Sequence, residues 1–136
     1  MPNILIVDDQ LHLQELFSHE LMEEGYSVVS AGDEESAKEY LVDSKPDLVL
    51  LDLYLNGFDG WDVLRDIKSK EPLLPVLIVT AYDSYVADPR VSQADGYMVK
   101  SFVHFDELKE KIADIFGRGP VNRVQAEAEE YSTRDR

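Results

Sequence analysis

The chain alternates short apolar segments of strand length with longer segments in which apolar residues recur at helical spacing. The expected strands lie at residues 3–7, 27–31, 48–51, 76–79 and 96–99. Helical patterns follow each of them, and a loop is expected over residues 56–60. Strands that alternate with helices favour parallel pairing, with helices on both faces of one sheet. We therefore predict an α/β, doubly wound fold with five parallel strands.

Local signals indicate where several of the helices begin and end. Gly25 follows the first helical segment at the place of a C-terminal cap. Asp33 is an expected N-cap for the second helix, which stops before Pro46 because proline restricts the residue that precedes it. Asp88 followed by proline resembles an N-cap and a first helical position, so a short helix is predicted over residues 89–94.

Length and apolar content separate a domain from a tail. The chain has 136 residues, enough for one domain with a real core, and we assign residues 1–116 to it. Residues 117–136 contain three sizeable apolar groups, too few for a second core, so we expect a disordered or marginally helical tail or linker.

The distribution of charge limits the possible partners. The formal net charge is −15, and residues 117–136 carry four arginines and four acids, so the whole excess belongs to residues 1–116. Such a surface repels phosphate backbones and anionic lipids, and we expect no direct binding to nucleic acid or membrane. Because no segment resembles a signal peptide or a bilayer span, a cytoplasmic location is the default expectation.

Polar side chains gather where the expected strands end. The residues at these ends are Asp8, Asp9, Asp52, Thr80 and Lys100. Each of them alone is common, but the carboxyl ends of parallel strands form the functional edge of such a sheet, so the joint placement is informative. Neighbouring carboxylates need cations between them, and Mg²⁺ suits a few carboxylates together with water and phosphate oxygens.

Four motifs together resemble the receiver domains of bacterial two-component response regulators. They are Val7-Asp8-Asp9, Leu51-Asp52-Leu53 leading to Gly57-Phe58-Asp59-Gly60, Val79-Thr80-Ala81, and Gly96-Tyr97-Met98-Val99-Lys100. The resemblance extends from residue 3 to about residue 116 and implies a flavodoxin-like sheet with strand order 2-1-3-4-5. It also implies a signalling switch that a histidine kinase or a histidine phosphotransfer protein phosphorylates.

The resemblance assigns a role to each residue of the site. Asp52 would be the phosphoacceptor, because a carboxylate is a competent nucleophile toward phosphorus. Asp9 and Asp52 would bind Mg²⁺ directly, Asp8 through water, and Tyr54 through its backbone carbonyl. Lys100 would neutralise charge on the transferring phosphoryl group.

Two further residues would carry the signal to an unknown downstream protein. The resemblance implies that Thr80 donates a hydrogen bond to a phosphoryl oxygen and that Tyr97 swings inward as Thr80 moves. The alternative for Tyr97 is a half-buried strand tyrosine whose hydroxyl reaches water.

Three positions depart from the family's usual pattern. Ser101 follows the strand-five lysine where proline is usual, and Asn56 replaces the usual proline of the loop after the phosphoacceptor. Pro89 lies where a fourth helix normally runs. None of these departures removes a reacting group.

Three alternatives remain open at this point. The chain could be the receiver part of a longer regulator that has an output domain. A small Mg²⁺-dependent phosphatase of the haloacid dehalogenase type would need a second carboxylate at the position of Tyr54. A flavin or nucleotide carrier would need a phosphate-binding loop after the first strand, where Asp8-Asp9-Gln10 would repel phosphate.

Overall fold

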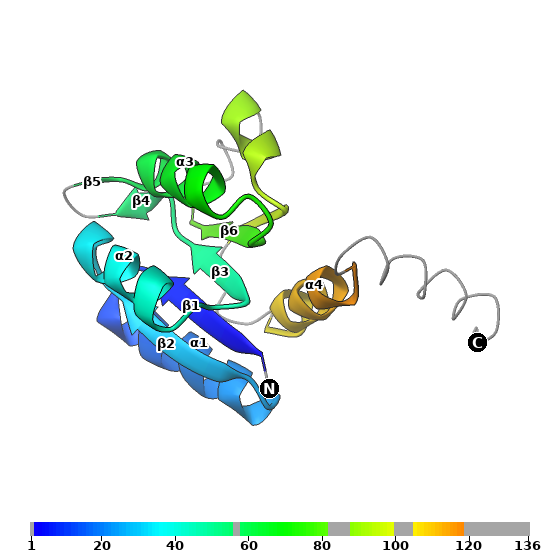
Figure 1. The fold of residues 1–136 in the computed structure, drawn as a ribbon. Coiled ribbons are helices and arrows are strands. Elements are labelled where there is room, and N and C mark those ends of the chain that lie inside the picture. Colours follow the sequence, from blue (N-terminus) through cyan, green and yellow to red (C-terminus); the bar gives the residue numbers. More distant parts are fainter. Residues whose placement is uncertain (1, 56–57, 82–87, 100–104, 119–136) are drawn as a thin grey trace, which may run out of the picture. The chain divides into compact units, whose positions relative to one another are not determined.

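The computed structural model describes residues 2–55, 58–81, 88–99 and 105–118. The chain divides into two compact units, residues 1–103 and residues 104–136, and each unit is described by itself. The first unit contains a five-stranded sheet and the helices around it, and the second contains one described helix (Figure 1).

The sheet confirms the predicted fold class. Its strands are β1 (Asn3–Val7), β2 (Ser27–Ala31), β3 (Leu48–Leu51), β6 (Val76–Thr80) and β7 (Gly96–Val99). They are arranged in the order β2-β1-β3-β6-β7, and every neighbouring pair is parallel. Numbered along the chain, these five strands have the order 2-1-3-4-5 of the flavodoxin-like fold.

Helices cover both faces of this sheet. They are α1 (Leu11–Glu23), α2 (Glu34–Asp43) and α3 (Gly60–Lys70), with a short 3-10 helix η2 (Pro89–Gln93) before β7. In Figure 1, α2 and α3 lie in front of the sheet and α1 lies behind it. Within the described residues, none of the helices is both long and apolar enough to cross a bilayer.

Strand residues alternate between two apolar layers because successive side chains point to opposite faces. One layer joins strand residues such as Leu5, Val49 and Ile78 to Leu64 and Ile67 of α3. The alternate residues of β1, β3 and β6 are also buried, and α1 packs on β1 and β2. A sheet buried on both faces explains why the strands have almost continuous apolar sequences.

The second unit contains α4 (Phe105–Arg118). Leu108, Ile112 and Ile115 recur along it at the spacing of one helical face. The helix continues to Arg118, two residues beyond the expected limit of the domain at residue 116.

Two predicted helix ends are confirmed in detail. Gly25 has φ = 97° and donates its amide to Met22, while the amide of Tyr26 donates to Leu21, which is the Schellman arrangement at the end of α1. At the start of α2, Asp33 Oδ1 accepts a hydrogen bond of 2.7 Å from the amide of Ser36. This bond is the main cause that lowers the pKa of the Asp33 carboxyl.

The end of α2 contains a backbone conformation that its residue type does not favour. Lys45 lies directly after the C-cap residue Ser44 and has φ = 47°, in the left-handed region. We expect Lys45→Gly to raise the free energy of unfolding by ~1 kcal/mol, because glycine adopts this region without steric cost. Urea denaturation checks this result, and Lys45→Ala, which keeps the Cβ, should bring no comparable gain.

The expected loop over residues 56–60 is partly wrong. Strand β4 (Tyr54–Leu55) pairs antiparallel with β5 (Phe58–Asp59), and α3 already begins at Gly60. The sequence signal for this pairing is Asn56-Gly57, a dipeptide strongly favoured between the two strands of a tight hairpin. These two residues lie outside the described ones.

The short helix predicted at residues 89–94 exists as the 3-10 helix η2. Its N-cap is Asp88, as expected, and Asp88 Oδ1 accepts from the amide of Arg90 at 2.9 Å. The guanidinium carbon of Arg90 lies 4.3 Å from the centroid of the buried Trp61 ring, which connects η2 to the first turn of α3.

The carboxyl of Asp88 should titrate well below the usual range. Its pKa falls from 3.8 to about 2, mainly because the Arg90 side chain donates hydrogen bonds of 3.0 and 2.8 Å to its two oxygens. Since the folded-state pKa is depressed, the interaction stabilises the fold fully above the unfolded value of about 3.9. That contribution is lost as the pH falls through about 2.

NMR titration of the side-chain carboxyl carbons measures this pKa directly. Arg90→Ala should return the pKa of Asp88 toward its ordinary value. An ordinary value in the unmodified protein would mean that the ion pair between Arg90 and Asp88 is not formed in solution.

Candidate phosphoacceptor and metal site

Two strands carry the acidic residues of the candidate site. Val7 ends β1 and is paired with Leu51, the last residue of β3, so Asp8 and Asp52 leave the sheet side by side. The amide of Asp52 also donates to the Val7 carbonyl at 3.0 Å. Both side chains are almost fully buried, with Asp8 2% and Asp52 6% exposed.

Asp9 completes a group of three carboxylates. One oxygen from each of Asp8, Asp9 and Asp52 lies within 4.8 Å of the other two, and Asp9 is half-buried. Two oxygens that bind one Mg²⁺ ion at 2.0–2.1 Å can be at most about 4.2 Å apart. Oxygens that lie within 4.8 Å of one another are close to this limit, so the three carboxylates form a candidate site for one metal ion.

Backbone and amide groups hold Asp8 in place. Its Oδ1 accepts a hydrogen bond of 2.9 Å from the amide of Gln10, and its carbonyl accepts one from the side-chain amide of Gln14. Sequence reasoning missed Gln14, which is buried on α1 together with Phe17 and Leu21. A polar residue within that apolar face was the available signal.

Thr80 ends β6 at the same edge of the sheet, as predicted. It is 0% exposed, and its Oγ1 has no hydrogen-bond partner among the residues that the structure describes. A buried hydroxyl without a partner is unfavourable, which makes Thr80 a candidate for binding a ligand at this edge of the sheet.

Gly60 fixes the backbone next to Asp52, which sequence reasoning also missed. A Cβ at this position would lie 2.6 Å from Leu53 Cα and 2.7 Å from the Asp52 carbonyl oxygen. The amide of Gly60 donates to the Leu53 carbonyl at 3.1 Å, and Asp59 caps α3 through a 2.9 Å bond from the amide of Trp61. Only glycine allows the start of α3 to approach the Asp52-Leu53 backbone this closely.

The structure describes only part of the environment of the other predicted site residues. Tyr97 is half-buried and packs against the core layer that includes α3. Tyr54 lies in β4, directly beyond the site. Lys100 and Ser101 lie outside the described residues, so the structure does not test their predicted roles.

Comparison with known proteins agrees with this arrangement. The sequence profile of the response regulator receiver domain matches residues 4–113. The probable transcriptional regulatory protein TcrX of Mycobacterium tuberculosis is 34% identical over 130 residues, which cover 93% of this chain and 54% of TcrX. The chain thus spans about half the length of this curated relative.

Two solved structures of a Thermotoga maritima protein are similar in both sequence and fold. The response regulator TrrA in complex with Mg²⁺ and BeF is 40% identical, with a TM-score of 0.80, covering 85% of this chain and 99% of TrrA. TrrA in complex with the histidine kinase ThkA is 40% identical, with a TM-score of 0.78, covering 85% and 98%. The chain, with its matching profile, sheet order and relatives, belongs to the response regulator receiver domain family.

Proposed function

We propose that this receiver domain accepts a phosphoryl group on Asp52 in a Mg²⁺-dependent reaction. The observation that carries the proposal is the buried Asp52 carboxylate, whose oxygen lies within 4.8 Å of oxygens of Asp8 and Asp9. The hydroxyl of Thr80, which has no hydrogen-bond partner among the described residues and lies at the same sheet edge, supports it. Mg²⁺ and BeF bind to the similar protein TrrA, which supports the same ligands here.

In the proposed reaction an Asp52 oxygen attacks the phosphorus of a phosphodonor. A bond forms between that oxygen and phosphorus, the bond from phosphorus to the donor's leaving atom breaks, and an acyl phosphate results. The buried β3 end and the contact with Gly60 hold Asp52 in one orientation, which reduces the entropic cost of the attack. Lys100 would balance charge on the phosphoryl oxygens, and Thr80 would donate its hydroxyl to one of them.

The three carboxylates provide a suitable site for Mg²⁺. Asp9 and Asp52 would bind the ion directly, Asp8 through water, and the Tyr54 carbonyl would complete the protein ligands. When bound, the ion supplies positive charge that offsets the negative charge of the transferring group. Without it, the mutual repulsion of three closely spaced carboxylates would oppose the approach of a phosphate.

The proposed partners are a sensor histidine kinase or a histidine phosphotransfer protein, and a downstream protein. The kinase ThkA binds the similar protein TrrA, which supports a kinase partner for this chain. The signal would leave through Thr80 and the half-buried Tyr97, since the adjacent strands β6 and β7 carry them. TcrX, which is longer than this chain, supports the second possibility of a receiver that works together with an output domain.

Intact-mass measurement tests the central proposal. Acetyl phosphate with Mg²⁺ should add a single phosphoryl group, and removal of Mg²⁺ by a chelator should prevent the addition. Unchanged phosphorylation in the chelator would contradict the proposed role of the metal.

Removal of the Thr80 hydroxyl should increase the stability of the fold but weaken its response to the bound ligands. We expect Thr80→Val to raise the free energy of unfolding by ~1 kcal/mol, because it removes a buried hydroxyl that lacks a described partner. The same change should weaken the response of Tyr97 fluorescence or NMR signals to Mg²⁺ and beryllofluoride. A clear loss of stability in Thr80→Val would show instead that the hydroxyl is already satisfied within the protein.

A further inference from the structure

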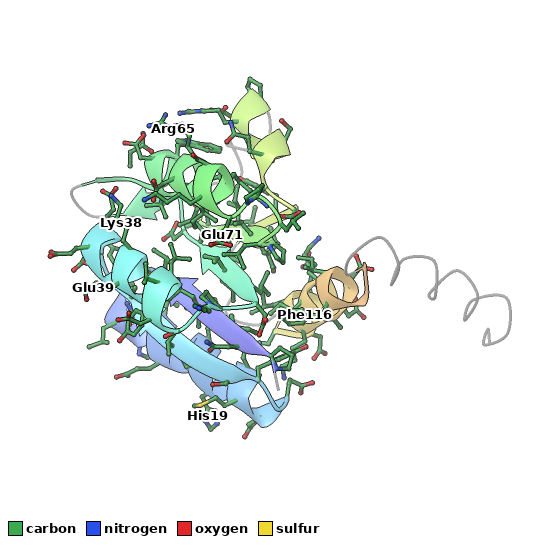
Figure 2. The ribbon with its side chains drawn as sticks, viewed as in Figure 1. His19, Lys38, Glu39, Arg65, Glu71 and Phe116 are labelled. Carbon is green, nitrogen blue, oxygen red and sulfur yellow. The ribbon has the colours of Figure 1, made fainter. Side chains whose placement is uncertain are left out.

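The inner face of α1 buries a polar side chain among apolar ones. Gln14 is 9% exposed, and the other buried residues of this helix are Leu13, Phe17 and Leu21. Exposed polar residues lie on the opposite face, and Figure 2 shows His19 at the outer side of α1. A buried amide is unfavourable unless it is hydrogen-bonded, so the partner of Gln14 indicates what the residue does.

That partner belongs to the candidate metal site. The side-chain amide of Gln14 donates a hydrogen bond to the carbonyl of Asp8. This carbonyl is part of the peptide that joins Asp8 to Asp9, two of the three grouped carboxylates. The amide of Asp8 donates to Ala31, the last residue of β2, at 3.0 Å, whereas the donor to the Asp8 carbonyl comes from α1. Gln14 thus holds the peptide plane between two carboxylates.

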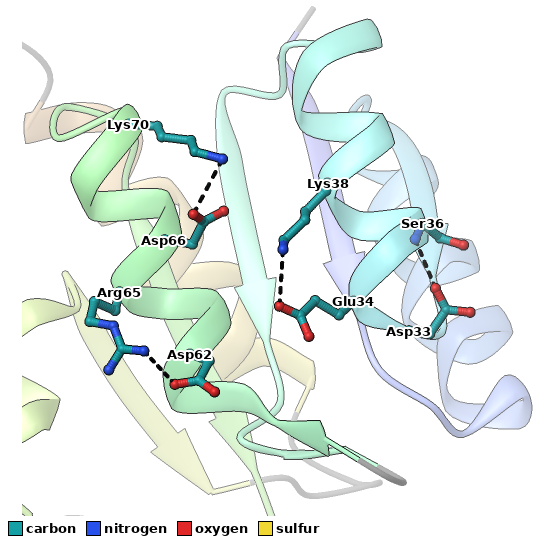
Figure 3. Close-up of polar contacts among 8 residues, drawn as sticks. All are labelled: Asp33, Glu34, Ser36, Lys38, Asp62, Arg65, Asp66 and Lys70. Carbon is teal, nitrogen blue, oxygen red and sulfur yellow. Dashed lines mark hydrogen bonds and ion pairs between the residues drawn. The ribbon is translucent and has the colours of Figure 1, made fainter.

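Gly32 leaves room for the amide of Gln14. A Cβ at position 32 would lie 3.3 Å from Nε2 of Gln14 and 3.8 Å from the carbonyl oxygen of Asp8. The backbone there is tied to α2, since Figure 3 shows the next residue, Asp33, accepting a hydrogen bond of 2.7 Å from the amide of Ser36. A side chain at position 32 would therefore displace the amide of Gln14 rather than the backbone.

We propose that Gln14 is a positioning residue that sets the affinity and the selectivity of the metal site. This role rests on the proposed function, which assigns Mg²⁺ to the site. Mg²⁺ requires near-ideal octahedral geometry with oxygens at about 2.0–2.1 Å, whereas Ca²⁺ accepts a more flexible geometry at about 2.3–2.6 Å. Rotation of the Asp8-Asp9 peptide moves both carboxylates, so the hydrogen bond from Gln14 favours the ion with the stricter geometry.

The test measures binding of Mg²⁺ and of Ca²⁺ to the full chain by isothermal titration calorimetry. Gln14→Met keeps a long unbranched side chain of similar helix propensity but removes the donor. It should weaken Mg²⁺ binding about tenfold, the lower end of the range for groups that orient metal ligands. Ca²⁺ binding should weaken less than about threefold, because the larger ion tolerates displaced carboxylates.

Gly32→Ala approaches the same contact from the other side. The new methyl group should displace the amide of Gln14 and weaken Mg²⁺ binding severalfold. In the Gln14→Met background the same change should leave the affinity for Mg²⁺ as it is, because no amide remains to be displaced. Two changes that act through one contact are not additive, and the double variant measures this coupling.

Leu21→Val is the matched control for a general loss of packing. Leu21 is 0% exposed on the same face of α1, about two turns of helix from Gln14. The change should destabilise the core in urea denaturation but leave both metal affinities unchanged. Weaker Mg²⁺ binding in Gln14→Met, with unchanged binding in Leu21→Val, therefore separates positioning from stability.

Several results would overturn the role of Gln14 and leave the proposed function intact. They are equal Mg²⁺ affinity of Gln14→Met and the unmodified chain, an equal loss of Mg²⁺ and Ca²⁺ affinity, additive effects of Gln14→Met and Gly32→Ala, and a matching loss in Leu21→Val. Absence of Mg²⁺ binding to the unmodified chain would instead overturn the proposed metal site, and the role of Gln14 with it.

Discussion

Asp52→Asn is expected to abolish phosphorylation while the fold persists. The substitution keeps the shape of the side chain but replaces the nucleophilic carboxylate oxygen by an amide nitrogen. Asp52 is 6% exposed and directly follows the central strand β3, whose backbone an isosteric change leaves in place. Intact mass after incubation with acetyl phosphate and Mg²⁺ should show no added phosphoryl group, and circular dichroism should show an unchanged spectrum.

Asp9→Ala provides the companion measurement. Asp9 lies in the same group of carboxylates but would act on the metal rather than on phosphorus. The rate of phosphorylation should fall strongly and recover in part at high Mg²⁺ concentration, whereas Asp52→Asn should show no recovery. Phosphorylation of Asp52→Asn at the original rate would mean that another residue is the phosphoacceptor.

Gly60→Ala is expected to lower the free energy of unfolding by ~2–3 kcal/mol, the upper part of the range for overpacking. The new Cβ would lie 2.6–2.7 Å from three backbone atoms of Asp52 and Leu53, which cannot rotate away as a side-chain end can. Alanine favours a helix over glycine by ~1 kcal/mol or less, so the steric cost dominates. The same displacement should slow phosphorylation, because the atoms that must move belong to the phosphoacceptor segment.

Two other glycines serve as controls for this result. At Gly25 an added Cβ meets nothing within 4 Å, so Gly25→Ala should cost only ~1 kcal/mol through its φ of 97°. At Gly32 the nearest atom is the side-chain Nε2 of Gln14, at 3.3 Å, which can shift. Urea denaturation of the three variants should show the largest loss of unfolding free energy in Gly60→Ala. If Gly60→Ala were as stable as Gly32→Ala, α3 would not be packed against the phosphoacceptor segment.

Much of the site could be predicted because its residues lie at strand ends. Asp8 and Asp52 directly follow apolar segments, and parallel strands bring such positions to one edge. The contacts of Gln14 with Asp8 and of Gly60 with Asp52 could not be predicted from the sequence, for a physical reason. Each acts through a contact with backbone atoms distant in sequence, and neither its residue type nor its spacing reveals that partner.

The sequence by itself determined the alternation of strands and helices, the caps at Gly25 and Asp33, and the order of the acidic residues. These features depend on local periodicity and backbone preference, which a single chain segment expresses without its neighbours. Tertiary structure alone decided what depends on distance between segments. It brought three carboxylates within 4.8 Å, left the Thr80 hydroxyl buried without a described partner, and placed the side-chain amide of Gln14 against the Asp8 carbonyl. Burial and electrostatic interactions depend on such distances, so local sequence patterns do not predict them.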